Sequence, residues 1–207
     1  EPIGISIIFD TKRCWSLCFH GAYILEVFCL TSAVVCNTML NEEKRGAGGK
    51  AMEFAAAYTK FWQELSPARK MVLATALAEK VTARMMSVVV LEEKLYFQTD
   101  ITFRKYQQIR SNPHVALCAD NIQIEGYCQE EGIPACHAAF SSAFQAHFPG
   151  SYQRYSALQH ERVFSVTPTF IERWLYIDGK PHIETFAIES ALYSLLEYGA
   201  NGEHTAY

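Results

Sequence analysis

The sequence lacks any excess of positive charge. Its 207 residues include 18 Lys and Arg against 22 Asp and Glu, which gives a formal net charge of −4. General nucleic-acid binders need a cationic surface to hold the phosphate backbone, so we expect no nucleic-acid partner. A few local cations are still enough for a small phosphorylated ligand, which is the ligand class that this charge balance favours.

The sequence also lacks the cysteine spacing of a disulfide framework or a zinc site. Its seven cysteines, an odd number, lie at irregular intervals. Cys136 precedes His137, but the pair does not belong to the close-spaced clusters of structural zinc sites. We therefore expect reduced thiols, a cytoplasmic location and no metal. The chain shows no Ser-His-Asp arrangement and no phosphate-loop glycine pattern, so the catalytic residues stay unknown.

Residues 1–51 differ from the rest of the chain. They hold an apolar run over 15–40 and end in a polar, glycine-rich linker over 41–50. The run is long enough for a membrane span of about 20 residues, but Glu26 near its middle makes a span unfavourable. We expect a dispensable apolar appendage. An extra strand or helix packed on the main domain, a poorly ordered extension, and upstream sequence read through before a natural start at Met52 remain open.

Residues 52–207 are predicted to form the main domain, beginning with an amphipathic helix from Phe54 to Leu65. About six to eight short strands with few helices favour a mainly β fold, an antiparallel β-barrel with flanking helices, because closure removes exposed strand edges. Strands are predicted over 71–78, 81–91, 94–99, 114–119, 122–129, 162–166, 169–177 and 182–188, and further helices over 136–148, 152–160 and 190–198.

An anion site is predicted where one strand passes into a helix. The strand ends in Thr99, and the following helix carries Arg104 and Lys105 in its first turn. Unpaired N–H groups and the positive end of the helix dipole attract a phosphate to such a position. Arg84 lies on a neighbouring strand, where a guanidinium among apolar residues must find an anion or remain poorly satisfied. The sequence therefore predicts one phosphate pocket with three cations.

At these residues the chain resembles the pyridoxamine 5'-phosphate oxidase-like family, whose fold is the FMN-binding split β-barrel. The family pattern is an Arg on the second strand, an aromatic strand ending in Thr, a basic pair, an Asn-Pro, and a strand ending in Glu-Gly. The order and spacing of all five elements are matched here by Arg84, Tyr96-Phe97-Gln98-Thr99, Arg104-Lys105, Asn112-Pro113 and Ile122-Gln123-Ile124-Glu125-Gly126.

The resemblance implies FMN as cofactor and a set of residues that bind it. The FMN phosphate would be bound by Arg84, Arg104 and Lys105, with Thr99 at the phosphate-ribityl end. Main-chain groups of Met85, Met86 and Ser87 would meet the edge of the flavin ring, and Asn121 would be the polar amide near it. The resemblance also implies a homodimer with flavin at the subunit interface, where Trp174 is a candidate to approach the partner's flavin.

One departure from the family affects the expected reaction. Pyridoxamine phosphate oxidases proper carry a later Arg-x-His arrangement, and the segment from Phe170 to His182 does not. A short single-domain relative is therefore expected, an FMN-dependent oxidoreductase that acts on a small organic substrate, with NAD(P)H as a possible electron donor. A non-enzymatic flavin or haem module for binding or sensing, and a split barrel that binds another phosphorylated cofactor such as deazaflavin, remain open.

Overall fold

The computed structural model describes residues 50–199. Residues 50–64 are helical, in agreement with the predicted amphipathic helix. The remaining elements, in chain order, are β1 (Ala68–Leu77), β2 (Lys80–Leu91), β3 (Lys94–Asp100), α2 (Arg104–Ser111), β4 (His114–Ala119), β5 (Ile122–Gly132), the 3-10 turn η1 (Pro134–Cys136), α3 (Ala138–His147), α4 (Pro149–Tyr155), β6 (Glu161–Ile177), β7 (Lys180–Ala187) and β8 (Leu192–Glu197).

Six antiparallel strands close into a barrel. The strand order is β3-β2-β1-β4-β5-β6, and a second pairing of β3 with β6 joins the two ends of that series. The inward residues form one apolar core that includes Phe97, Leu117, Phe164 and Ile171. The predicted mainly β barrel with flanking helices is thus confirmed.

The barrel wall is incomplete between β2 and β3. The ladder between these strands joins only Val89–Leu91 to Lys94–Tyr96. Beyond that point β3 pairs with β6 up to Asp100, and β2 pairs with β1 back to Lys80. The side of β2 that faces β3 therefore has no strand partner over residues 80–88 within the described part of the chain.

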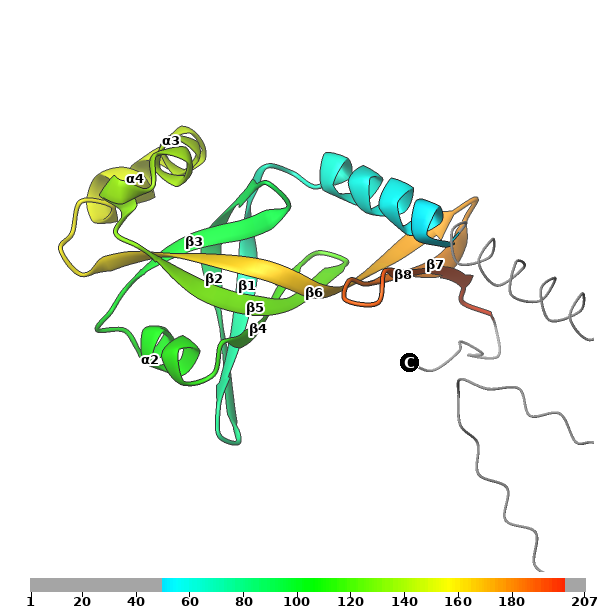
Figure 1. Ribbon diagram of the computed structural model, residues 1–207, viewed down its shortest axis with the longest axis horizontal. Helices are drawn as coiled ribbons and strands as arrows, with labels where there is room; N and C mark the ends of the chain where they lie inside the picture. Colours follow the sequence, from blue (N-terminus) through cyan, green and yellow to red (C-terminus); the bar gives the residue numbers. More distant parts are fainter. Residues whose placement is uncertain (1–49, 200–207) are drawn as a thin grey trace, which may run out of the picture. The chain divides into compact units, whose positions relative to one another are not determined.

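A second layer forms where β6 leaves the barrel. β6 continues through residue 177 and pairs with β7, which pairs with β8, so these strands form an extension beside the barrel (Figure 1). The helix over residues 50–64 packs on this extension through Phe54, Tyr58 and Phe61, whose rings contact Phe186 on β7. An amphipathic helix therefore covers one face of the extension.

Several of the predicted elements differ in the structure. The helix predicted over 190–198 is wrong, because Leu192–Glu197 forms strand β8 on the open edge of β7. Its apolar residues fit either periodicity, and the free strand edge decides between them. The helix predicted over 152–160 is instead α4, which begins at Pro149, since its fixed φ suits the first turn of a helix, and ends at Tyr155. The strands predicted over 162–166 and 169–177 are one continuous strand, β6.

Within residues 50–199, no helix is both long enough and apolar enough to cross a membrane. The apolar run over 15–40 and the rest of the predicted appendage up to residue 49 lie outside the described residues. The boundary predicted at Met52 therefore stays a prediction.

Gly126 permits the close contact between β5 and β6. A register shift separates Glu125 from Gly126 in this ladder. A Cβ at position 126 would lie 2.5 Å from the carbonyl oxygen of Thr167 and 2.7 Å from Cγ1 of Val166. Real Cβ atoms do not approach a backbone oxygen so closely, so only glycine fits at this bulge.

We expect Gly126→Ala to lower the free energy of unfolding by about 1 to 3 kcal/mol, because the added methyl group overpacks the β5–β6 ladder. Urea denaturation measures this change. Gly150→Ala is the matched control, since nothing lies within 4 Å of a Cβ built at Gly150. Equal stabilities of the two variants would contradict the close packing inferred at Gly126.

Candidate functional site

The junction of β3 and α2 places two of the predicted cations. Asp100, the last residue of β3, accepts hydrogen bonds at 2.7 Å from the backbone N–H and the hydroxyl of Thr102. This turn starts α2, and Arg104 and Lys105 are its first two residues. The first N–H groups of a helix have no partner within the helix. Local sequence thus brings positive charge to the start of α2, as predicted.

Thr99 carries a buried hydroxyl without a partner. The residue is 2% exposed, and its Oγ1 has no hydrogen bond within the described structure. It lies on the same strand face as Phe97, pointing to the barrel interior where β3 has left β2. A buried hydroxyl without a partner costs free energy, and a ligand oxygen that accepts its hydrogen bond would remove this cost.

Arg84 is held by neutral oxygens at the barrel end beneath α2. Its Nη1 donates to the carbonyl oxygen of Leu73 at 3.2 Å and to Oγ1 of Thr75 at 2.7 Å. Its Nη2 donates to Oγ1 of Thr82 and, at 3.1 Å, to Oε1 of Gln108 on α2. All four Nη protons are therefore used, and no acceptor of this set carries a negative charge.

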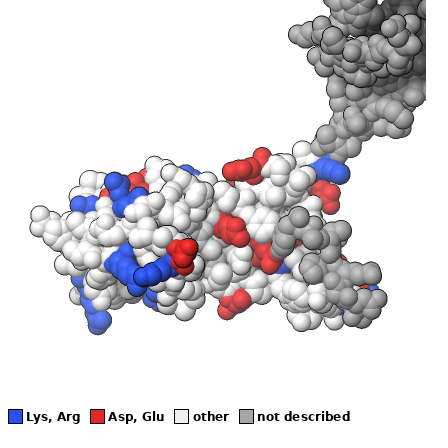
Figure 2. Space-filling view, turned by 90° about the horizontal axis from the view of Figure 1, so that it is seen from below, with Lys and Arg blue, Asp and Glu red and all other residues white. Residues whose placement is uncertain are grey.

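The three predicted cations lie within electrostatic range of one another. Burial lowers the pKa of Arg84, and the charge of Arg104 lowers it further. Burial likewise lowers the pKa of Lys105, with a further decrease from Arg84. Within residues 50–199, no ion pair involves any of the three. Figure 2 shows Lys and Arg side chains gathered over the end of the molecule that carries α2.

Two carboxyl groups border this cation cluster on the outer side of β3. Asp100 and Glu161 are partners in the β3–β6 ladder, and Glu161 is only 5% exposed. Burial raises the pKa of Glu161 to about 7, with a further increase from Asp100, while Lys105 and a hydrogen bond with Gln98 oppose the shift. At neutral pH Glu161 is therefore partly protonated and only partly offsets the positive charge nearby.

The unpaired edge of β2 contains the other predicted cofactor residues next to Arg84. Met86 points into the core at 9% exposure, whereas Met85 points outward and is 60% exposed. The Ser87 hydroxyl accepts a hydrogen bond from Nζ of Lys70 at 2.5 Å. This stretch has no strand partner on its β3 side, and because the N–H and C=O groups of a strand point alternately to its two neighbours, only alternate residues direct theirs to that side.

Asn121 is not brought to the cation cluster. Thr75, beside Arg84, pairs with Val115 at the start of β4, whereas Asn121 follows the other end of that strand. Its Nδ2 donates to the carbonyl oxygen of Trp174, whose N–H donates back to the Asn121 carbonyl at 3.0 Å. A contact of Asn121 with flavin stays a prediction.

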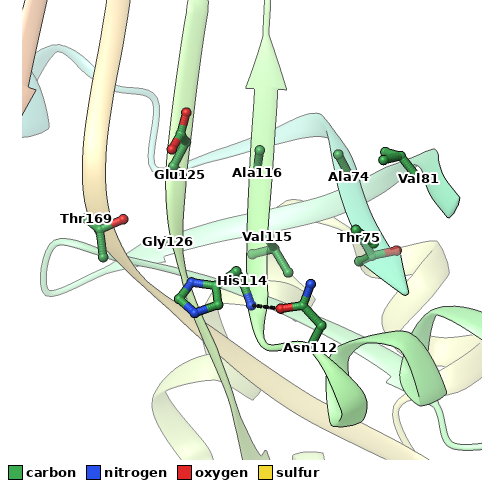
Figure 3. Close-up of a pocket in the computed structure, with 11 residues that line it drawn as sticks. Ala74, Thr75, Val81, Asn112, His114, Val115, Ala116, Glu125, Gly126 and Thr169 are labelled. Carbon is green, nitrogen blue, oxygen red and sulfur yellow. Dashed lines mark hydrogen bonds between the residues drawn. The ribbon is translucent and has the colours of Figure 1, made fainter. Parts of the chain in front are cut away.

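A hollow of about 300 Å³ lies on the outer face of the barrel (Figure 3). It includes none of the eight predicted cofactor residues. Small side chains form much of its floor, with the polar groups of Asn112, His114 and Glu125 around them. Its lining residues are Ala74, Thr75, Ala76, Val81, Asn112, His114, Val115, Ala116, Glu125, Gly126 and Thr169.

The sequence did not reveal the groups that position Arg84 or the acid beside Lys105. Gln108 lies four residues after Arg104, and a polar residue in that spacing is an ordinary feature of a helix. Thr75 and Thr82 become neighbours only through the β1–β2 register. Thr82 and Arg84 are two residues apart on one strand, and this spacing alone indicates that their side chains point to the same face.

Comparison with known proteins finds matches only among solved structures. No family model matches the chain, and no curated protein matches it. Similar solved structures include a pyridoxamine 5'-phosphate oxidase-related, FMN-binding protein from Nostoc punctiforme, with 15% identity, a TM-score of 0.45, and coverage of 75% of this chain and 96% of that one.

Two further similar structures are general stress protein 26 of Bacillus anthracis and PhzG of Burkholderia lata in complex with tetrahydrophenazine-1-carboxylic acid. The first has 20% identity, a TM-score of 0.45, and coverage of 56% and 91% of the two chains. The second has 13% identity, a TM-score of 0.44, and coverage of 70% and 89%. The closed six-strand barrel of the structure agrees with the fold that the resemblance to the pyridoxamine 5'-phosphate oxidase-like family implies.

We expect the free energy of unfolding to fall as the pH rises from about 4.5 to about 7. Because the folded pKa of Glu161 lies above its ordinary value, the folded chain retains a proton that the unfolded chain releases in this range. Glu161→Gln should remove this loss, which amounts to at most about 3 kcal/mol. Urea denaturation at several pH values measures it. Glu189→Gln, at an exposed position, is the control, and parallel pH profiles of wild type and Glu161→Gln would refute the assignment.

Proposed function

We propose that this chain binds FMN and acts as an FMN-dependent oxidoreductase on a small organic substrate. The observation that carries the proposal is the cluster of Arg84, Arg104 and Lys105, which lacks an ion-pair partner within residues 50–199 and lies at the end of β3. The unpartnered hydroxyl of Thr99 and the unpaired edge of β2 adjoin the cluster. A phosphate with a flat, polar-edged ring attached fits these features together.

The phosphate end of FMN would lie at the start of α2. Arg104 and Lys105 form no ion pair within the described part of the chain, and Lys105 contacts the face of the Phe103 ring, whose centroid lies 4.3 Å from Nζ. Charged hydrogen bonds from such groups to phosphate oxygens are stronger than bonds between neutral groups. Arg84 adds charge from beneath, and the Thr99 hydroxyl would donate to a phosphate or ribityl oxygen. Thr99 would thereby gain a hydrogen-bond partner, and the three cations would gain an opposite charge.

The flavin ring would lie along the unpaired edge of β2. Main-chain groups of Met85, Met86 and Ser87 would hydrogen-bond to the polar edge of the ring, in place of the strand that is missing there. Main-chain donors and acceptors on a rigid strand hold a ligand in one orientation with little loss of entropy. Met86 would fix the strand from inside the core.

When bound, FMN supplies the hydride and electron chemistry, and the protein binds and orients it. We therefore assign this chain's residues to binding and leave the catalytic residues unassigned. The electron donor that we propose is a reduced nicotinamide. The second candidate is a non-enzymatic flavin module, which would use the same binding residues.

We further propose that two copies associate through the outer face of the barrel. Ala74, Ala76 and Ala116 give this face a small-residue surface, and Met85 and Val81 expose 60% and 70% of their area beside it. Small side chains allow two sheets to approach closely, and exposed apolar residues favour burial. A flavin on the β2 edge would then lie between the subunits, where a second chain provides the other wall of its cleft.

We expect the purified protein to show the visible absorption of oxidised flavin and to release FMN, identified by mass spectrometry. Lys105→Ala and Arg104→Ala should each weaken FMN binding by about 1.5 to 3 kcal/mol, the value of a lost charged hydrogen bond. Fluorescence titration of the apoprotein measures both. Lys60→Ala, on the helix over residues 50–64, is the control. Unchanged FMN affinity in both site variants would refute the proposed phosphate site.

The same preparation separates an enzyme from a module. Anaerobic addition of NADH or NADPH should bleach the flavin at a rate that increases with the concentration of the nicotinamide. Flavin that remains oxidised with both donors would favour the non-enzymatic module. A haem spectrum in place of flavin, or release of a deazaflavin, would exclude FMN as the cofactor.

We expect Ala116→Arg to convert a dimer into a monomer, because it places an uncompensated charge in the outer face of the barrel. FMN affinity should fall with it by about tenfold or more, a loss of about 1.4 kcal/mol. Light scattering coupled to size exclusion measures the mass. Ala56→Arg makes the same change at an exposed position of the helix over residues 50–64. A dimer that persists in Ala116→Arg would locate the interface elsewhere.

A further inference from the structure

Gln108 lies at the centre of the anion site without facing the ligand. It is 1% exposed, on the face of α2 that covers the barrel end. Its Oε1 accepts hydrogen bonds from the hydroxyl of Thr75 at 2.8 Å, from the hydroxyl of Thr82 at 2.9 Å, and from Nη2 of Arg84 at 3.1 Å. One neutral oxygen thus joins α2, β1 and β2 around the guanidinium.

We propose that Gln108 is a positioning residue that orients Arg84 and keeps its charge uncompensated, and that it thereby makes the site selective for phosphorylated over unphosphorylated flavin. This inference rests on the proposed function and specifies how the site distinguishes its ligands. Because the side chain acts through Arg84, it needs no contact with the cofactor.

Arg173 in the same chain shows the alternative arrangement. It is also largely buried, but it forms ion pairs with Glu184 and, at 2.8 Å, with Glu64. Burial alone would lower the pKa of Arg173, and the bonds to these two carboxylates raise it above its ordinary value. The charge of Arg173 is therefore neutralised, and its role is to attach the helix over residues 50–64 to the extension.

Arg84 has only neutral acceptors and lies near two further cations. Its pKa is lowered by burial and then by Arg104, with no carboxylate among the causes. Its Nη protons are all donated within the protein, so Arg84 acts on an anion chiefly through its charge and its remaining Nε–H. A carboxylate in place of the Gln108 amide would pair with the guanidinium at the same geometry and cancel that charge.

The substitution Gln108→Glu should therefore affect ligand binding without lowering the stability of the fold. Gln and Glu have nearly the same shape, so Gln108→Glu retains the acceptor for Thr75, Thr82 and Arg84. In this variant the Arg84 guanidinium provides the counter-charge for the buried carboxylate, so the fold should be retained. The affinity should fall only for a ligand whose binding depends on the uncompensated charge of Arg84.

The experiment compares Gln108→Glu with Gln107→Glu, which makes the same substitution at the next, exposed residue of α2. Affinities for FMN and for riboflavin, which lacks the phosphate, are measured by flavin fluorescence, and stability by urea denaturation. We expect Gln108→Glu to bind FMN about tenfold or more weakly than Gln107→Glu. Its riboflavin affinity should be unchanged, and its stability equal to or above that of wild type.

Other outcomes separate this inference from the proposed function. Equal FMN affinities in the two variants would overturn the role of Gln108 while FMN binding by the wild type stands. A parallel loss of stability, FMN binding and riboflavin binding, or failure of Gln108→Glu to fold, would show a purely structural residue and overturn it too. A wild type that binds neither flavin would instead refute the proposed function, and the inference with it.

A second measurement tests the pairing itself without any flavin. The effect of Gln108→Glu on the free energy of unfolding is measured twice, once in the wild type and once in the Arg84→Met variant. Gln108→Glu should be markedly more destabilising in the Arg84→Met variant, because the carboxylate then has no partner. An unchanged difference would show that residues 84 and 108 do not interact, and it would overturn the inference whatever the flavin affinities are.

Discussion

Arg84 joins two strands and a helix through four neutral oxygen acceptors, and the rest of the candidate site is arranged around that cage. A half-buried guanidinium has lost part of its hydration, and carbonyl, hydroxyl and amide oxygens replace only the hydrogen bonds. The charge itself remains unbalanced. With Arg104 and Lys105 nearby, the barrel end carries a positive potential that a carboxylate at position 108 would have removed. The Arg84 guanidinium keeps its orientation only while α2 stays packed over the strand ends.

The interrupted ladder between β2 and β3 is the second constraint. Strand edges within a sheet are normally paired, and an unpaired edge must be covered or bound. Here β3 stays paired with β6 from Leu95 to Asp100, whereas its ladder with β2 ends at Tyr96 and leaves Met85, Met86 and Ser87 without a strand partner on that side. Thr99 lies in the part of β3 beyond the ladder with β2, and its buried hydroxyl has no partner within residues 50–199. The end of β3 therefore combines a strand edge that lacks its β2 partner with an unsatisfied hydroxyl.

Sequence patterns indicated the strands and the placement of Thr99, Arg104 and Lys105, because these depend on local order along the chain. The β1–β2 hairpin and the strand-to-helix junction follow from alternation and from the turn at Asp100. Contacts between distant segments were beyond such patterns. The cage around Arg84 needs Thr75, Thr82 and Gln108, which only the β1–β2 register and the packing of α2 bring together. Strand β8 was mistaken for a helix because its neighbour β7, and not its own composition, determines its conformation.

β6 runs without interruption from the ladder beside Thr99 to the pairing with β7. One backbone therefore serves both the barrel and the extension that carries the helix over residues 50–64. β6 has one extra residue, Thr169, at the register shift opposite Glu125 and Gly126, and a strand bends most easily at such a bulge. This bulge lies between the segment of β6 beside Thr99 and the segment that pairs with β7, so a tilt of the extension would be absorbed there and would leave the barrel end in place.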